Sequence, residues 1–405
     1  VVSDWSSDVC SSDLIRPHKA VQDFIDEEGK FKSLVEAAGW LYPGGGHRHA
    51  IHKATKLNEP IESAFVLLFA SVGVIYYTLK SRVRGRKARL AMLVPEISDL
   101  ELYVEVRQAI AEQSVLELTA SSASDAALRM LTTITANQTS NQFADGLGGS
   151  FVCRVMTFGI VSWNEKQKTR TYAHSVFSGR LIGFENYRVA AAIFKNHWQK
   201  SKEEQKGKKQ EKKESYFIAS PTARELIADN IAQGRAWFHN FTTFLDQKEV
   251  RKGLLYERKE LFQMIEKASF EDENERIFIS VCHISWRRRM SKLAERASKE
   301  GADRGRLIQK EFERLRTSIS RSRNAHNLRE TIVDWWARAG TNQELQGEGL
   351  SKLLPLFNEK NWKKARDLAL LALISYQPKD KQEAVDMAAI QPAETSIEEG
   401  ESTNE

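Results

Sequence analysis

The segment Tyr42–Lys56, with the sequence YPGGGHRHAIHKATK, brings together three glycines, three histidines and three basic residues. Three histidines are candidate metal ligands, but zinc sites usually add cysteine or carboxylate, and neither occurs between Gly44 and Leu57. Exposed glycine amides flanked by basic side chains instead suit contact with a phosphate. The segment predicts a nucleic-acid contact or an ordinary exposed loop, and no metal or other cofactor. The candidate contact residues are His47, Arg48, His49 and Lys53.

A basic hairpin is predicted in the segment KSRVRGRKAR, residues 80–89, where Gly85 marks a tight turn between two apolar strands. Alternate residues of a strand share one face, so several guanidinium groups would project together. A two-stranded ribbon fits a nucleic-acid groove, and arginine binds phosphate or guanine edges with two hydrogen bonds. The alternative is a solvated turn. The candidate contacts are Arg82, Arg84, Arg86, Lys87 and Arg89, with a weaker copy at Lys166, Lys168 and Arg170 on a second hairpin.

The segment 306–321 predicts an amphipathic helix with one basic side. At about 100° per residue, its basic positions fall within about 80° of one another and its apolar positions lie opposite. Side chains four residues apart rise by roughly 6 Å, a spacing that suits a nucleic-acid backbone. The basic positions are Arg306, Lys310, Arg314 and Arg321, and the apolar ones are Ile308, Phe312, Leu315 and Ile319.

A compact group of cations precedes this helix in the sequence WRRRM, where Trp286 is a candidate for stacking on a base. The cations are Arg287, Arg288 and Arg289. Residues 276–329 contain 15 Lys and Arg against 5 Asp and Glu, whereas the whole chain has a net charge of +6. Such a concentration of positive charge predicts a polyanionic partner. The alternative is a basic but idle surface that the acidic C-terminal tail balances.

Catalytic motifs are missing from the sequence, which has no Walker loop, HExxH, GxSxG or paired carboxylate–lysine nuclease pattern. We therefore predict that the chain is not an enzyme. One alternative is a HEPN-like ribonuclease, because Arg321 and His326 satisfy the loose Arg-x4-His spacing of those enzymes. Ser322 occupies the place where such motifs usually carry a polar amide or a ring.

The pattern of apolar residues predicts an α+β fold: a mixed α/β domain with antiparallel hairpins, then a helical bundle. Helices are expected over 18–39, 98–117 and 122–136, and from Trp362 to Tyr376 before Pro378. The apolar run Ala64–Leu79 has sixteen residues, whereas a membrane-spanning helix needs about twenty. It is interpreted as buried strands, alone or with a short helix, and no membrane association is expected.

Changes of composition predict the domain boundaries. Ser3–Leu14 reads like a translated sequencing adapter, and Lys200–Glu214 contains no apolar residue. Cys153 and Cys282 form no disulfide framework, which favours a cytoplasmic location. The predicted regions are a non-native segment 1–14, an α/β domain 15–199, a charged linker 200–215, a basic helical bundle 216–378 and a disordered acidic tail 379–405.

Several longer stretches together resemble the large subunit of type I CRISPR effector complexes (Cascade), in the branch of the MYXAN subtype. The N-terminal ones are LYPGGGHRHAIHKATKLNEP, LLFASVGVIYYTLKSRVRGRKARLAMLVPEISDLELY and VMTFGIVSWNEKQKTRT. The C-terminal ones are WRRRM, EFERLRTSISRSRNA and NEKNWKKARDLALLALISYQ. The resemblance covers residues 16–378. Members of this family are longer at the N-terminus, so a part of the protein is expected to be missing here.

The resemblance implies a non-catalytic protein of antiviral defence that binds guide RNA and target DNA within Cascade. In this family the N-terminal domain inspects a short flanking motif on duplex DNA. The helical domain helps to hold the displaced strand, and a separate helicase–nuclease cuts. The Gly44–Lys56 loop and the Arg82–Arg89 hairpin would then sense the motif or contact the guide, and Arg306–Arg321 would contact the displaced strand. A helical scaffold that binds only other proteins is a further alternative.

Overall fold

The computed structural model describes residues 24–36, 58–79, 89–95, 100–136, 151–161, 168–178, 181–201, 215–340, 345–346 and 349–378, together with residues 384, 385, 388 and 390. The chain divides into two compact units. The first comprises Val1–Glu112 and Val152–Ser175, and the second comprises Gln113–Phe151 and Val176–Glu405. The second unit therefore includes a segment from the N-terminal half of the chain.

The N-terminal part of the first unit is extended, whereas the sequence predicted a helix over residues 18–39. Strands β1 (Leu34–Glu36) and β2 (Asn58–Pro60) form an antiparallel pair. An isolated bridge joins Ile25 to Phe31, around a turn. The helix prediction is wrong over residues 25–36, and residues 18–23 and 37–39 of the predicted range lie outside the described residues.

A tight turn explains this outcome. The carboxylate of Asp26 accepts hydrogen bonds from the backbone N–H groups of Glu28, at 3.0 Å, and Lys30, at 2.8 Å. Gly29 adopts a φ of +78°, which glycine reaches without a steric penalty. A side chain that satisfies nearby backbone donors competes with helix formation. The local hydrogen bonds therefore outweigh the apolar periodicity.

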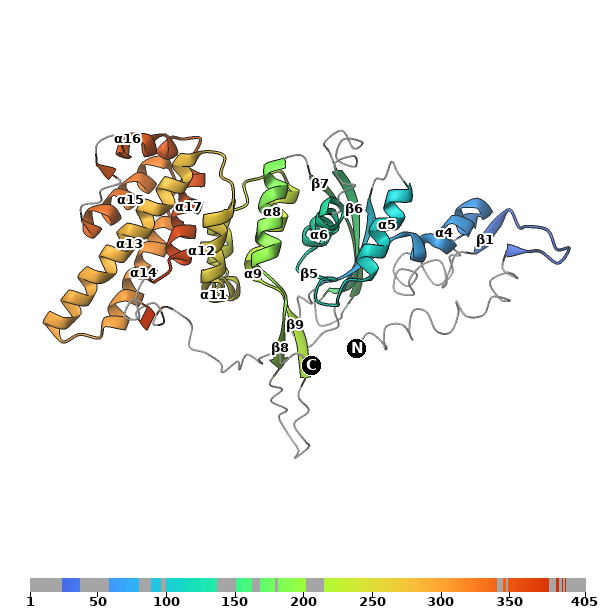
Figure 1. Ribbon diagram of the computed structural model, residues 1–405, viewed down its shortest axis with the longest axis horizontal. Coiled ribbons are helices and arrows are strands. Elements are labelled where there is room, and N and C mark those ends of the chain that lie inside the picture. The colour runs from blue at the N-terminus through green and yellow to red at the C-terminus, as the bar shows by residue number, and fades with distance from the viewer. Residues whose placement is uncertain are drawn as a thin grey trace, which may run out of the picture. The chain divides into compact units, whose positions relative to one another are not determined.

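The rest of the first unit is built on a sheet in which strands lie in the order β3-β4-β6-β7, and β6 and β7 lie side by side in Figure 1. Strand β3 pairs with β4 from Ile75↔Leu93 to Leu79↔Arg89, and β4 pairs antiparallel with β6. The strands that the two predicted hairpins require are therefore present, as β3 with β4 and as β6 with β7. The elements are α4 (Ile61–Gly73), β3 (Ile75–Leu79), β4 (Arg89–Pro95), α5 (Leu100–Ala111), β6 (Phe151–Val161) and β7 (Lys168–Ser178).

The apolar run Ala64–Leu79 is a helix up to Gly73 and a strand from Ile75, so it contains both kinds of element that the interpretation allowed, and the helix is the larger part. A continuous apolar run has no period that separates a buried helix from a buried strand. The hydroxyl of Tyr103 on α5 donates to the carbonyl oxygen of Gly73 at 2.7 Å and satisfies a carbonyl at the helix end. Among the described helices, none combines the length and the hydrophobicity that a membrane-spanning helix requires.

The second unit is mainly helical, as the sequence predicted for its C-terminal part, and the α+β class is confirmed. Its elements are β5 (Thr119–Ala120), α6 (Ala123–Ala136), α8 (Leu181–Ile193), β8 (His197–Ser201), β9 (Ser215–Ala219), α9 (Thr222–Ala232), α10 (Phe241–Asp246), α11 (Lys248–Tyr256), α12 (Arg258–Lys267), α13 (Glu273–Glu300), α14 (Arg304–Ser320), α15 (Ala325–Ala339), α16 (Gly349–Leu353), the 3-10 helix η2 (Leu354–Phe357) and α17 (Trp362–Ser375).

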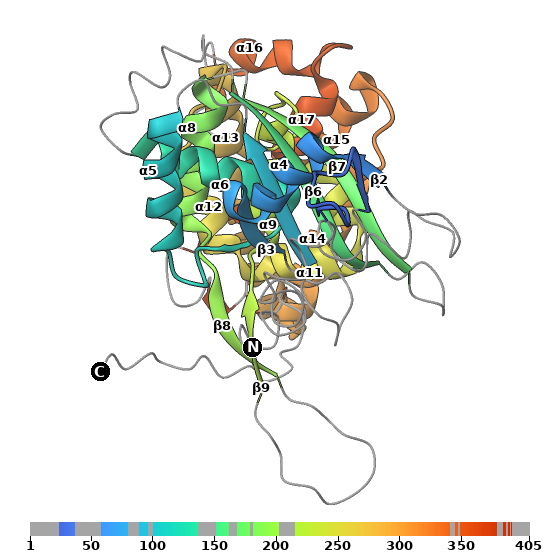
Figure 2. The same ribbon diagram turned by 90° about the vertical axis from the view of Figure 1, so that its right-hand side faces the viewer.

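Strands β8 and β9 form an antiparallel hairpin that extends away from the helices of this unit in two perpendicular views (Figures 1 and 2). The hairpin leads into and out of residues 202–214, most of the predicted charged linker, which lie outside the described residues. Helices α6 and α8 precede that linker, yet they pack against α9, which follows it. The predicted domain boundaries remain predictions.

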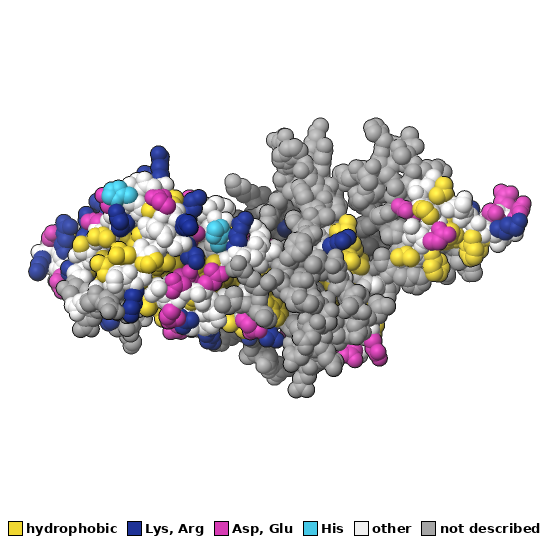
Figure 3. Space-filling model, turned by 90° about the horizontal axis from the view of Figure 1, so that it is seen from above, with side chains coloured by type: hydrophobic (Ala, Val, Ile, Leu, Met, Phe, Trp, Pro, Cys, Tyr) yellow, Lys and Arg dark blue, Asp and Glu magenta, His cyan; other side chains and the backbone are white. Residues whose placement is uncertain are grey.

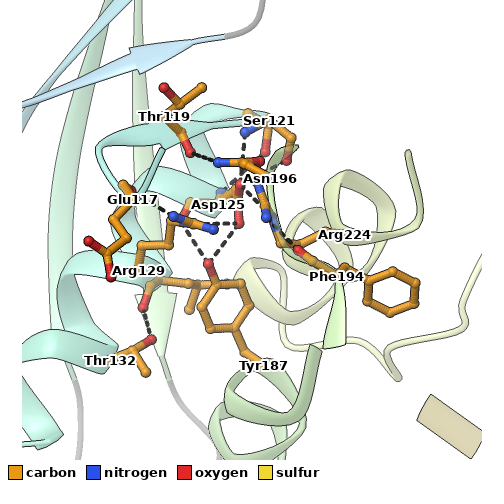
Figure 4. Close-up of polar contacts among 12 residues, drawn as sticks. Glu117, Thr119, Ser121, Asp125, Arg129, Thr132, Tyr187, Phe194, Asn196 and Arg224 are labelled. Atoms are coloured by element: carbon orange, nitrogen blue, oxygen red, sulfur yellow. Dashed lines mark hydrogen bonds and ion pairs between the residues drawn. The ribbon is translucent and has the colours of Figure 1, made fainter. Parts of the chain in front are cut away.

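A buried ion pair ties these three helices together (Figure 4). Arg224 on α9 donates from Nε to a carboxylate oxygen of Asp125 on α6 at 3.0 Å, and both side chains are fully buried. The hydroxyl of Tyr187 on α8 donates to the other oxygen at 2.7 Å. Burial alone would raise the pKa of Asp125, but Arg224 and Arg129 outweigh it and hold that pKa below its usual value.

The remaining groups of this ion pair are also satisfied. Arg224 donates from Nη1 to the carbonyl oxygen of Phe194 at 2.6 Å and from Nη2 to Oδ1 of Asn196 at 2.7 Å. Asp125 also accepts from the backbone N–H of Ser121 at 2.8 Å. A buried charge is tolerated when it is paired and its other hydrogen-bonding groups find partners. The network therefore fixes α6, α8 and α9 in one arrangement.

Helix α17 is the centre of the helical core. It contacts α10, α11, α12, α13, α14 and α15, and every residue from Leu368 to Ile374 has no exposed surface. Its buried carboxylate, Asp367, accepts hydrogen bonds from the backbone N–H groups of Asn240, at 2.9 Å, and Thr242, at 3.0 Å. The start of α10 is thus capped by a residue far away in the sequence.

His283 on α13 makes the stability of this helical core depend on pH. Its ring lies against Phe262, and Nε2 is 3.1 Å from the hydroxyl of Ser375. Burial lowers the pKa of His283 to about 4, although a hydrogen bond with the backbone of Ala372 opposes the shift. Between about pH 4 and pH 6.5 the unfolded chain binds a proton that the folded chain does not. We expect the free energy of unfolding to rise by roughly 2 kcal/mol across that window, because stability increases with pH wherever the unfolded state binds more protons.

Urea denaturation at several pH values between 4 and 7.5 measures this effect. In the variant His283→Gln the rise between pH 4 and pH 6.5 should shrink, whereas the exposed control His326→Gln should keep it. An equal rise in the wild type and in His283→Gln would show that other groups cause the dependence.

Candidate nucleic-acid interface

Helices α13, α14 and α15 are each capped at the N-terminus by a side chain, and this explains the residue at which each helix begins. Asp272 accepts from the backbone N–H of Asn274, and Asp303 accepts from that of Arg306. Asn324 caps α15 in the same way. Helix α13 ends at Gly301, whose φ is +62°. Such caps satisfy backbone groups that have no partner inside the helix, and they set the turns between consecutive helices.

Helix α14 is amphipathic, as the sequence predicted. Its apolar positions Ile308, Phe312, Leu315 and Ile319 are all buried. On the other side, Arg306 and Lys310 are exposed, and neither side chain forms a hydrogen bond or ion pair with any residue that the structure describes. We call Arg306 and Lys310 the α14 basic face. These two cations are available to a partner outside the chain.

Arg314 and Arg289 are already paired with a carboxylate of their own chain. Glu311, a largely buried residue of α14, accepts hydrogen bonds from Arg289 on α13 at 2.8 Å and from Arg314 at 2.9 and 3.0 Å. Burial raises the pKa of Glu311, but hydrogen bonds from the two arginines outweigh burial and lower it. Arg314 also lies 3.8 Å from Asp334. Both arginines therefore serve mainly to hold the helices together.

The other two arginines of the WRRRM sequence are only partly exposed. Arg287 and Arg288 lie on α13 between buried neighbours, Trp286 and Met290. Trp286 has no exposed surface and packs edge to face against Phe312, with ring centroids 6.1 Å apart. The expectation that Trp286 stacks on a base is therefore wrong. An aromatic side chain beside arginines looks the same in the sequence whether it faces solvent or the core.

Arg321 ends α14 and lines an open pocket together with residues of α17. The pocket has a volume of about 570 Å³ and is lined by Ser320, Arg321, Ser322, Arg323, Trp362 and Arg366. No site was predicted at Trp362 or Arg366. Trp362 belongs to the apolar pattern of the last predicted helix and Arg366 lies within that helix, and only the folded chain places them beside Arg321.

The histidine of the ribonuclease alternative lies on a different helix from its arginine. Arg321 is the C-cap of α14, whereas His326 is in the first turn of α15. Nε2 of His326 is 3.3 Å from a carboxylate oxygen of Glu330, and both side chains are well exposed. The Arg-x4-His spacing therefore does not correspond to one continuous helix face.

Most of the predicted N-terminal contact residues lie outside the described residues: His47, Arg48, His49, Lys53, Arg82, Arg84, Arg86, Lys87 and Lys166. Arg89 lies at the start of β4 and is partly buried. Lys168 and Arg170 lie on β7, in a part of the strand where only the backbone is described. No group of three or more potential metal ligands occurs in the part of the chain that the structure covers.

Positive charge does not cover the helical unit evenly. Figure 3 shows Lys and Arg side chains interspersed with Asp and Glu over one face of these helices, around an apolar patch. Oppositely charged neighbours reduce the potential that a distant polyanion experiences. A contact surface therefore has to be assigned from individual cations without acidic partners, such as the α14 basic face and the pocket arginines.

Two domain families match parts of the chain. The DevT C-terminal domain matches residues 266–404, and the DevT N-terminal domain matches residues 13–68. The chain is also 29% identical over 377 residues to the CRISPR-associated protein Cas8a1/Csx13 of Myxococcus xanthus (strain DK1622). That match covers 88% of this chain and 64% of the relative, so the chain spans less than two thirds of the curated relative's length. The resemblance to the large subunit of MYXAN-subtype complexes is thereby confirmed.

Proposed function

We propose that this chain is a non-catalytic large subunit of a type I CRISPR RNA-guided surveillance complex and that its helical unit binds nucleic acid. The observation that carries the proposal is the α14 basic face, where Arg306 and Lys310 are exposed and have no acidic partner among the described residues. These two lie one helical turn apart in a region that matches the DevT C-terminal domain.

The division of labour follows from the same proposal. Guide RNA pairing reads the target, while the protein holds backbones and inspects the short flanking motif. The helical unit would hold the displaced strand through the α14 basic face. The loop Gly44–Lys56 and the hairpin Arg82–Arg89 would contact the guide or the flanking motif. The partners are guide RNA, target DNA, other subunits of the complex and a separate helicase–nuclease, in the cytoplasm.

The ribonuclease alternative has less support. General acid–base catalysis needs the two groups within reach of one substrate, and Arg321 and His326 belong to different helices. His326 is also paired with Glu330 on its own helix. The protein-binding scaffold remains as the second alternative, and the dependence of binding on salt separates it from the main proposal.

The test is binding of the full chain to labelled single-stranded DNA by fluorescence anisotropy, over a range of salt concentrations. The variant Arg306→Ala/Lys310→Ala should bind about tenfold more weakly at low salt. Its plot of log affinity against log salt should be shallower by about 1.4, because each phosphate contact on a single strand contributes about 0.7 to that slope. A scaffold that binds only proteins would show neither effect.

A matched control removes the same charge elsewhere. Arg296→Ala/Lys299→Ala lies on α13, where both side chains are exposed and Arg296 is paired with Glu300. This control should bind as the wild type does. Equal losses in the two variants would show that only net charge matters and would contradict a contact at α14. The same mixtures, run with RNA on a denaturing gel, test the enzyme alternative. RNA that is cut by the wild type and intact with His326→Ala would favour the ribonuclease.

A further inference from the structure

We infer that the pocket between the C-terminal end of α14 and the N-terminal end of α17 binds a phosphate group of a nucleic-acid strand. We call it the 321–366 pocket; its lining is Ser320, Arg321, Ser322, Arg323, Trp362 and Arg366. The inference rests on the proposed nucleic-acid binding of the helical unit. It adds a specific subsite and the chemical group that this subsite takes.

The lining of the pocket offers donors and no carboxylate. Arg321 and Arg323 are exposed, and neither makes a side-chain hydrogen bond or ion pair with a residue that the structure describes. Two further donors are buried without a hydrogen-bond partner, the hydroxyl of Ser320 and Nε of Arg366. Both residues line the pocket, but these two atoms are covered, so the donors that the pocket presents to a ligand are the exposed guanidinium groups of Arg321 and Arg323. A group that only accepts hydrogen bonds and carries negative charge fits this lining.

Arg366 is held in place by contacts that leave part of its guanidinium unused. Nη1 donates to the carbonyl oxygen of Ser322 at 3.4 Å, and the guanidinium lies over the ring of Trp362, 5.2 Å from its centroid. Stacking on tryptophan orients an arginine without consuming its in-plane donors. Trp362 itself is only 9% exposed, so its role is to position Arg366 and not to stack on a base.

Phosphate matches these features better than carboxylate or a neutral ligand. Its several oxygens can accept from the forked donors of more than one guanidinium, a geometry that arginine supplies and lysine does not. Trp362 is also the first residue of α17, and the positive end of a helix dipole favours an anion there. The pocket volume of about 570 Å³ has room for a nucleotide, not only for the phosphate.

The position of the pocket relates it to the α14 basic face. Arg306 and Arg321 are separated by fifteen residues of one helix, or about 22 Å at 1.5 Å per residue. A strand that follows α14 would therefore present an internal phosphodiester to the pocket. A phosphate monoester at the end of a strand offers the same acceptor oxygens, so it is the second possible source of the phosphate in the pocket.

The test compares three variants of the full chain in salt-dependent titrations with labelled single-stranded DNA. Arg321→Ala/Arg323→Ala should weaken binding by about tenfold and make the salt dependence shallower by about 0.7, one phosphate contact. Arg366→Lys keeps the charge but loses the forked donors, and it should also weaken binding, by about threefold. Arg296→Ala/Lys299→Ala is the control of equal charge and should bind normally. Thermal unfolding of each variant shows whether it is folded.

Two forms of the same oligonucleotide distinguish the sources of the phosphate. If the pocket takes an internal phosphodiester, 5′-hydroxyl and 5′-phosphate oligonucleotides lose affinity equally in Arg321→Ala/Arg323→Ala. If it takes a strand end, only the 5′-phosphorylated form loses affinity. Normal binding of both forms by this variant and by Arg366→Lys overturns the inference. In that case the variant Arg306→Ala/Lys310→Ala still tests the proposed function. A wild-type chain whose DNA binding does not depend on salt would reject both the pocket inference and the proposed function.

Discussion

Replacing Arg224 with Ala is expected to lower the free energy of unfolding by about 3–5 kcal/mol, because it leaves the carboxylate of Asp125 buried without its counter-charge. The guanidinium has no exposed surface and bonds to three different groups, Asp125, Phe194 and Asn196. These groups belong to α6 and to the segment after α8, so the loss should loosen the junction of α6, α8 and α9. Urea denaturation, followed by far-ultraviolet circular dichroism, measures the change.

Three further variants make this prediction specific. Asp125→Ala should cost about as much as Arg224→Ala, and the double variant Asp125→Ala/Arg224→Ala should cost less than the sum of the two. Arg235→Ala removes an exposed arginine that follows α9 and should change stability by less than about 0.5 kcal/mol. Strictly additive costs in the double variant would contradict a direct interaction between the two charges.

Replacing Trp286 with Ala is expected to lower the free energy of unfolding by about 3–5 kcal/mol, as for other fully buried tryptophans. Trp286 packs against Phe312 and thereby joins α13 to α14. Any loss of nucleic-acid binding in this variant should follow from partial unfolding. Denaturation curves and DNA titrations on the same sample separate the two effects.

A conservative variant provides the control. Trp286→Phe keeps an aromatic ring in the core and removes an indole N–H that is buried without a hydrogen-bond partner in the described structure. Its cost should be clearly smaller, at about 1–2 kcal/mol. If Trp286→Ala were as stable as the wild type and yet bound DNA poorly, the side chain would be a base contact and the assignment to the core would be wrong.

Helices with a clear period could be predicted from the sequence. The apolar residues Ile308, Phe312, Leu315 and Ile319 share one side of a helix by spacing alone, and they are the apolar residues that α14 buries. Helices α6 and α17 were predicted for the same reason. Where the apolar run had no period, as in Ala64–Leu79, a helix and strands were both allowed, and the large share of helix could not be predicted.

The partners of charged residues could not be predicted. Asp125 and Arg224 are 99 residues apart, and no local pattern marks them as a pair. The basic side of α14 was predicted as four equivalent cations, but Glu311 neutralises Arg314 and also binds Arg289 from the preceding helix. Only folding reveals which cations are already satisfied. The 321–366 pocket escaped prediction for a related reason, since its arginines come from two separate helices.

The central place of α17 has a consequence for biosynthesis. During translation the helices α10 to α15 are made before α17, although α17 is the helix that all of them contact. Until it emerges from the ribosome, the apolar faces that surround it have no partner and remain open to chaperones or to aggregation. The helical core is therefore completed after translation of its other helices. A frameshift near Trp362 should abolish the fold of this core, although it would leave the coding sequence of α10 to α15 intact.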